Sequence, residues 1–198
     1  MTRGRIALAA LCGAGVLLAL AGCGSTPVTH FYTLNPAQAA APPAAGNAPT
    51  VAIGAVQLPD GLDRPQIVLR GAGSQVTFSE FERWLGSPKD EIALAVASGL
   101  KQALGGASVY AYPMSAGMSA DVSVLLHVQR FDSVLGEAAT VEVLWQVVPA
   151  KGAARKGQSS VREPVGGPGY EALVAAHGRA LAAISRDIAN EIRAAQAR

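Results

Sequence analysis

The sequence of 198 residues is poor in charged residues, aromatic residues and cysteine. Charged residues make up 15% and aromatic residues 5%, whereas hydrophobic residues reach 50%. Because a disordered chain lacks the apolar residues that offset its ordering entropy, this composition excludes disorder and predicts one domain with a packed core. Removal of an N-terminal segment that contains Arg3 and Arg5 would leave 14 basic residues against the 14 acidic ones. A chain without excess positive charge has no electrostatic footprint for a phosphate backbone, so we expect no nucleic-acid partner.

The first 22 residues have the features of a secretory signal peptide. Arg3 and Arg5 precede an apolar run over residues 6–20, and small residues follow. The run is shorter than the roughly 18 residues that a membrane-spanning helix needs, and no charged stop-transfer segment follows it. We therefore expect residues 1–22 to be removed during export.

The predicted signal peptide is followed by the only cysteine of the mature chain. Leu20, Ala21, Gly22 and Cys23 resemble the lipobox of bacterial lipoproteins. The resemblance implies that a dedicated peptidase cuts before Cys23 and that its sulfur carries a diacylglycerol with acyl chains such as palmitate. The alternative is ordinary cleavage after Ala21, which would leave Cys23 as a free thiol. Gly24 follows rather than the aspartate that accompanies inner-membrane retention, so the resemblance implies the periplasmic face of the outer membrane.

The domain is expected to lie close to its membrane. Cys12 falls within the signal peptide, so the mature chain has one cysteine and forms no intramolecular disulfide. Residues 23–29 are predicted to form a lipidated tether, and at about 3.5 Å per residue the first strand begins within roughly 25 Å of the anchor. Residues 30–198 are predicted to form a single periplasmic domain that contains a Pro- and Ala-rich loop over residues 35–50.

Apolar periodicity predicts several strands and two amphipathic helices. One helix is expected after Ser87, with Pro88 at its first position and Gly105 beyond its end, and the other over residues 170–195. The expected strands are residues 30–34, 51–58, 66–70, 75–78, 108–112, 122–129, 141–148 and 159–162. The predicted fold class is α+β, a two-layer sandwich in which two amphipathic helices cover one face of a mainly antiparallel sheet.

The two longest strands are predicted to form an antiparallel hairpin around Gly136 with one strongly apolar face. On the other face Leu125, Phe131, Leu144 and Val148 interrupt the polar positions. Apolar residues on a nominally exposed face can mark an interface. The hairpin is therefore a candidate surface for a second copy of the chain or for another partner.

No motif predicts a catalytic, metal or cofactor site. None of His30, His127 and His177 has a Cys, His or Asp partner at metal-ligand spacing. The segment around Ser119 lacks the second glycine of a nucleophile elbow. The glycine-rich segments 71–73 and 166–169 match neither the phosphate-binding nor the dinucleotide-binding pattern. We expect no catalytic residue, no metal and no cofactor.

The most distinctive segment is LPDGLDRPQIV, residues 58–68. Together with FYTL at residues 31–34, FD at 131–132, EP at 163–164 and YEALV at 170–174, it resembles the ABC-type transport auxiliary lipoproteins of the paraquat-inducible, PqiC type. The resemblance covers nearly the whole mature chain, and the loop over residues 35–50 is a departure from it. The family resemblance implies a non-enzymatic accessory subunit of an MCE-type system that moves phospholipids or other lipids between two membranes.

Within that segment, Asp63, Arg64 and Gln66 are candidate contacts with the MCE-domain subunit, because loops on a rigid scaffold often carry recognition. A purely structural corner is the alternative. Two other functions stay open. A lipid- or solute-binding lipoprotein would need an enclosed apolar cavity, and an anchored hydrolase would need Ser119 beside His127 or His177.

Overall fold

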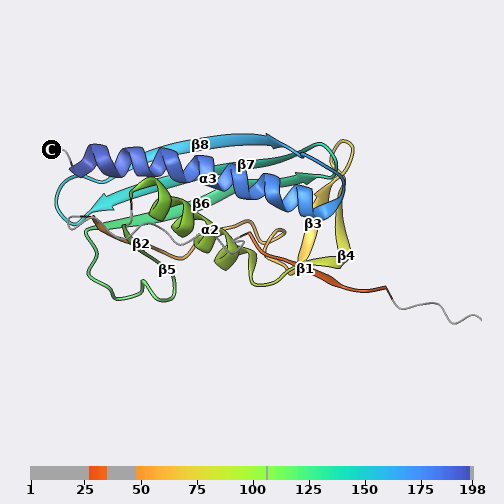
Figure 1. Cartoon of the computed structure of the whole chain (residues 1–198), viewed down its shortest axis with the longest axis horizontal. Helices are drawn as coiled ribbons and strands as arrows, with labels where there is room; N and C mark the ends of the chain where they lie inside the picture. Colours follow the sequence, from red (N-terminus) through yellow and green to blue (C-terminus); the bar gives the residue numbers. More distant parts are fainter. Residues whose placement is uncertain (1–26, 35–47, 106, 197–198) are drawn as a thin grey trace, which may run out of the picture.

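The computed structural model describes residues 27–34, 48–105 and 107–196. These residues form two layers, an eight-stranded sheet and two helices that cover one of its faces, as Figure 1 shows. The α+β prediction is confirmed. The strands are β1 (His30–Tyr32), β2 (Thr50–Ile53), β3 (Gln66–Arg70), β4 (Val76–Trp84), β5 (Ser108–Ala111), β6 (Val122–Val134), β7 (Ala138–Pro149) and β8 (Arg155–Pro164). The helices are α2 (Pro88–Ala103) and α3 (Gly169–Gln196).

Strand β6 is the centre of the sheet. It pairs antiparallel with β7 along almost its whole length, and β7 pairs antiparallel with β8. On the other edge of β6, its first residues pair parallel with β2, and Ser133 near its end pairs with Leu69 of β3. The sheet continues through β5 beside β2 and through β4 and β1 beside β3. In the described part of the chain the long ladders are therefore antiparallel, while the short ladders include parallel ones that the sequence did not predict.

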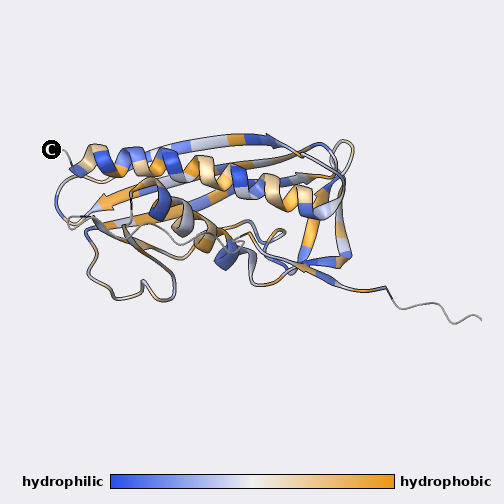
Figure 2. Ribbon diagram, in the orientation of Figure 1, coloured by the Kyte–Doolittle hydropathy of each residue, from blue (hydrophilic) through white to orange (hydrophobic). Residues whose placement is uncertain are grey.

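Both helices lie where the sequence predicts them. Helix α2 begins at Pro88 and is followed by Gly105 with a φ of +67°, a left-handed conformation that favours glycine. The acidic side chains of Asp90 and Glu91 lie in its first turn, where they interact favourably with the helix dipole. Figure 2 shows hydrophobic and hydrophilic residues alternating along α3. The stripe that faces the sheet is fully buried and consists of Leu173, His177, Leu181, Ile184, Ile188 and Ile192.

Several strands have other bounds than the sequence predicts. The strand expected over residues 51–58 ends at Ile53, although Gln57 still forms an isolated bridge with His127. The strand expected over residues 75–78 continues to Trp84, because β4 pairs with β1 as well as with β3.

Phe131 was expected on the outer face of the hairpin, and that expectation is wrong. The β6–β7 ladder shifts register between Val128 and Arg130. Such a bulge reverses the alternation of side chains, so Phe131 turns towards the helices. It is 5% exposed and packs against Trp84 and His177.

The two helices approach each other closely at Gly99 of α2. A Cβ atom built on Gly99 would lie 2.5 Å from the Ser185 Oγ of α3 and 2.6 Å from its Cβ. Ser185 is fully buried, and its hydroxyl donates a hydrogen bond to the Leu181 carbonyl at 2.8 Å. The hydroxyl therefore has little room to move away, and the helix contact requires glycine at this position.

We expect Gly99→Ala to destabilise the protein by about 1 to 3 kcal/mol through overpacking. Gly178→Ala in α3 is the matched control, because its Cβ would meet only the Leu34 carbonyl at an ordinary 3.9 Å. Alanine is the better helix former, so the control should be about 0.5 to 1 kcal/mol more stable than the wild type. Urea unfolding of both variants measures the difference. A Gly99→Ala protein as stable as the wild type would contradict the close approach.

Candidate functional site

The imidazole of His177 lies at the centre of the core. Its ring stacks on Phe131 with the centroids 4.0 Å apart, and the Trp84 ring meets it edge-on with the centroids 6.3 Å apart. Its Nε2 is 2.8 Å from the Ser133 hydroxyl, and its buried Nδ1 has no hydrogen-bond partner among the described residues. Burial lowers the pKa of His177 to about 3. The side chain is therefore a neutral core residue at neutral pH.

The contact between Ser133 and His177 does not form an accessible nucleophile and base, because the two residues are 2% and 0% exposed. His127 instead faces Gln57, with its Nδ1 2.8 Å from the amide oxygen. Among the described residues, neither histidine has a hydrogen bond to Ser119. No three His, Cys, Asp or Glu groups of the described residues gather closely enough to hold a metal ion. The described residues thus give no support to the anchored-hydrolase alternative.

The depressed pKa of His177 makes stability depend on pH. In the unfolded chain the histidine binds a proton below about pH 6.5, whereas in the folded protein it stays neutral down to about pH 3. The contribution of the neutral imidazole to the free energy of unfolding is therefore complete above pH 6.5 and is lost as the pH falls. We expect the protonation of this histidine in the unfolded chain to lower the free energy of unfolding by about 2 kcal/mol between pH 7 and pH 5.

Denaturant unfolding at the two pH values, in the wild type and in His177→Leu, isolates this contribution because the other titrating groups are shared. The loss of stability on acidification should be smaller in His177→Leu by that amount. His127→Gln, which replaces an exposed histidine, is the matched control. Identical pH dependence in the wild type and in His177→Leu would contradict the buried neutral imidazole.

Asp132 joins β6 to the part of the sheet that β3, β4 and β1 form. Strand β3 meets β6 at a single ladder pair, and next to that pair the Arg70 guanidinium binds the buried Asp132 carboxylate through two contacts of 2.9 and 2.8 Å. Arg130 binds the same carboxylate. Burial alone would raise the pKa of Asp132, but the hydrogen bonds from Arg70 and Arg130 outweigh it and hold the pKa below its usual value. This ionised carboxylate positions β3 and the segment that precedes it.

The candidate contacts Asp63, Arg64 and Gln66 lie in a corner that leads into β3. The Leu62 amide donates to the Pro59 carbonyl at 2.8 Å, which closes a turn. Asp63 and Arg64 do not pair with each other. The Asp63 carboxylate binds Lys89 of α2 at 2.7 Å, a hydrogen bond that raises the pKa of Lys89.

The rest of the corner contacts β4. The Arg64 guanidinium lies 3.8 Å from the centroid of the Phe78 ring, a cation–π contact. Gln66 pairs with Arg83 in the β3–β4 ladder. The corner thus presents partly exposed polar side chains on a backbone that is held by α2 and β4.

The outer face of the hairpin carries exposed apolar side chains at two of the four positions that the sequence predicts. Leu125 is 47% and Leu144 40% exposed, and Val148 is partly exposed. Leu125 and Leu144 border a hollow of about 310 Å³ on the face that the helices leave uncovered.

A larger apolar groove lies between α2 and α3. It has a volume of about 640 Å³ and is lined largely by small residues, including Ala95, Gly99, Ala175, Gly178 and Ala182. Phe31 of β1, which is 60% exposed, forms part of its rim. The groove is therefore open to solvent at this rim and is not the enclosed cavity that the lipid- or solute-binding alternative requires.

The predicted lipidation site Cys23 and the signal peptide lie outside the described residues, as does most of the predicted loop over residues 35–50. Among the residues that the structure does describe, neither helix is both long enough and apolar enough to cross a membrane.

Comparison with known families identifies the chain. A family model described as "ABC-type transport auxiliary lipoprotein component" matches residues 32–189. The chain belongs to this family of auxiliary lipoproteins. The match includes the corner at residues 58–68 and confirms the resemblance seen in the sequence. No curated protein matches the auxiliary lipoprotein's sequence.

Two crystal structures share the fold of this auxiliary lipoprotein. One is of an uncharacterized protein, with 18% identity, a TM-score of 0.69, and coverage of 84% of this chain and 99% of that one. The other is protein XCC0632 from Xanthomonas campestris, with 18% identity, a TM-score of 0.59, and coverage of 83% and 89%. At this identity the likeness shows the fold alone.

One group of surface residues was missed by the sequence analysis. Phe31 of β1 and Phe78 and Phe81 of β4 are 60%, 40% and 42% exposed. The β-prone composition of these segments gave no sign of which face each side chain would occupy. The short distance in sequence between the first strand and the predicted anchor could have singled out Phe31, whereas Phe78 and Phe81 join it only through the pairing of β1 with β4.

Proposed function

We propose that the protein is an accessory subunit of an MCE-type intermembrane lipid transport system, anchored by acylated Cys23 at the periplasmic face of the outer membrane. The observation that carries the proposal is the family match over residues 32–189 in a chain that has a complete lipobox before it. The role is one of docking and needs no catalytic group. A phospholipid or another lipid is the cargo of the whole system.

The proposed acyl chains are sufficient to hold the domain at the membrane. Each buried CH2 group of an acyl chain contributes about 0.8 kcal/mol, so two or more chains hold a protein stably at a bilayer. The folded domain then has no need to insert, and neither described helix could span the membrane. Gly24 at the position after Cys23 favours the outer membrane.

The corner of Asp63, Arg64 and Gln66 is the proposed contact with the MCE-domain subunit. It lies in the segment that carries the family resemblance, and its polar groups are presented on a rigid backbone. The exposed Leu125 and Leu144 of the hairpin are the proposed interface with a second copy of the chain. The open groove between the helices makes a dedicated lipid-binding role the weaker alternative.

Cys23→Ala tests the anchor. Without the sulfur no diacylglycerol can be attached, so the variant should remain an uncleaved precursor or appear as a soluble periplasmic species. Metabolic labelling with a fatty acid shows whether Cys23 is acylated. Label in the wild type and none in Cys23→Ala is expected, whereas label in the variant would rule out this lipidation site.

Replacing both Asp63 and Arg64 by Ala tests the corner. The exposed ion pair of Asp63 with Lys89 contributes little to stability. The contact of Arg64 with Phe78 contributes about 0.5 to 1 kcal/mol, so the melting temperature should fall by only a few degrees while capture of the MCE-domain subunit falls strongly. The matched control is Glu137→Ala with Arg162→Ala, an exposed ion pair that joins the β6–β7 turn to β8. It should leave both readouts unchanged. A destabilised corner variant that still captures the subunit would show that the corner is purely structural.

A further inference from the structure

Exposed apolar side chains gather at one end of the sheet. Of the thirteen large hydrophobic side chains that are exposed in the described residues, six lie in two short segments, residues 28–31 and 76–85. We call these six the anchor-side patch. They are Val28, Phe31, Val76, Phe78, Phe81 and Leu85. The two segments meet because β1 pairs with β4.

The central side chains of the patch lie at the edge of the sheet, where Phe31 borders both the groove between the helices and the hollow beside Arg64 and Arg83. Tyr32 contacts Tyr170 of α3, and its ladder partner Trp84 contacts His177 of the same helix. Side chains alternate along a strand, so the preceding pair, Phe31 and Arg83, faces the opposite side of the sheet. Phe81 is 42% exposed, and the neighbouring Glu82 accepts a hydrogen bond from the Tyr32 hydroxyl.

Two guanidinium groups accompany these apolar side chains. Arg64 stacks on Phe78, and Arg83 is the ladder neighbour of Phe31. Among the described residues no carboxylate lies within ion-pair distance of either guanidinium. Phe31, Leu85 and both arginines border a hollow of about 410 Å³. Apolar and aromatic groups beside unpaired cations match the chemistry of a bilayer surface that carries phosphodiester head groups.

The backbone that carries Phe31 is held on both sides. The β1 strand is held by its ladder with β4, and directly after it the Leu34 amide and the Thr33 hydroxyl both donate to the Glu91 carboxylate of α2, each at 2.8 Å. Phe31 is therefore fixed in direction relative to the core.

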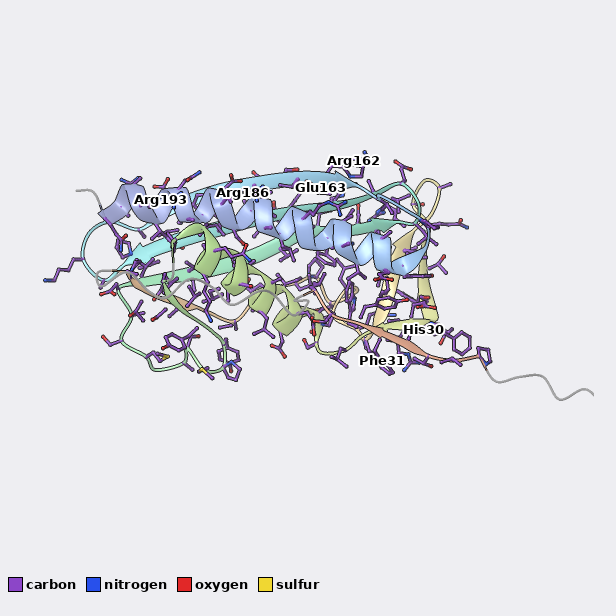
Figure 3. All side chains as sticks on the ribbon, viewed as in Figure 1. His30, Phe31, Arg162, Glu163, Arg186 and Arg193 are labelled. Carbon is purple, nitrogen blue, oxygen red and sulfur yellow. The ribbon has the colours of Figure 1, made fainter. Side chains whose placement is uncertain are left out.

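The chain outside the described residues adds a distance limit. Pro27 is the first residue that the structure describes, and it follows Cys23 by four positions, which span at most about 14 Å. Figure 1 shows that this end of the chain leaves the fold beside β1, and Figure 3 shows the labelled His30 and Phe31 at the same end. An acylated Cys23 would thus hold the patch next to the bilayer.

We propose that the anchor-side patch rests on the lipid surface that holds the anchor, with Phe31, Phe81 and Leu85 in the interface and Arg83 against lipid phosphates. The inference rests on the proposed acylation of Cys23 and adds a second contact to it. An acyl anchor alone leaves a domain free to swing on its tether, whereas a second contact fixes its orientation. The loop after β5, which includes Met114, then points away from the membrane.

Tryptophan emission in reconstituted vesicles tests the orientation. The acylated full-length lipoprotein is prepared as Phe31→Trp, Phe81→Trp and, as the control, Met114→Trp. Met114 is 70% exposed and lies in the loop after β5, the strand at the opposite edge of the sheet from β1. Vesicles contain phosphatidylethanolamine and phosphatidylglycerol with or without bromine on the acyl chains. Emission of the wild type, with its native Trp84 and Trp145, is subtracted. Acylation is verified from the mass of each intact protein.

We expect the emission at positions 31 and 81 to shift to shorter wavelength and to be strongly quenched by the brominated lipid, while position 114 shows neither change. Arg83→Gln, added to Phe81→Trp, should reduce that quenching more in vesicles with phosphatidylglycerol than in vesicles without it.

The other results overturn the inference in distinguishable ways. Acylated protein without quenching at positions 31 and 81, or with equal quenching at position 114, rules out the patch and leaves the anchor intact. A shift to shorter wavelength without bromine quenching means that a second copy of the chain covers the patch instead of lipid. A mature protein that carries no acyl group rules out both the anchor and the patch.

Discussion

The packing of α3 across the β6–β7–β8 strands is the contact on which the rest of the structure depends. Its stripe of leucine, isoleucine and histidine side chains is fully buried, and α2 then packs on α3 at Gly99. Both helices lie on one side, so no helix of the described residues covers the opposite face of the sheet. A domain with this arrangement has one surface that is used for its own stability and another that is available to partners.

The corner and the anchor-side patch belong to the part of the sheet formed by β3, β4 and β1. That part meets β6 through one ladder pair, so the Arg70–Asp132 ion pair next to it has a disproportionate effect on their position. The carboxylate is buried and accepts hydrogen bonds from two arginines, which keeps it ionised. The proposed recognition elements are thus held rigidly although they lie at the end of the sheet.

The sequence predicted well where a pattern is long and local. The 3.6-residue stripes of α2 and α3 and the alternation along β6 and β7 identified their elements to within a few residues. Phe131 was placed on the wrong face because a one-residue bulge leaves no trace in the alternation itself. The parallel pairing of β1 with β4 could not be predicted, since it joins segments about 50 residues apart. The patch that depends on this pairing was therefore missed, whereas the corner was found from its family motif.

Purification of the tagged, acylated protein from solubilised cell envelopes tests the central claim, that this auxiliary lipoprotein docks an MCE-type transport system at the outer membrane. Mass spectrometry of the proteins that accompany it should identify an MCE-domain subunit, and the amount of that subunit should fall for the Asp63 and Arg64 double variant but not for the Glu137 and Arg162 control. Recovery of the acylated protein without any MCE-domain subunit would contradict the claim.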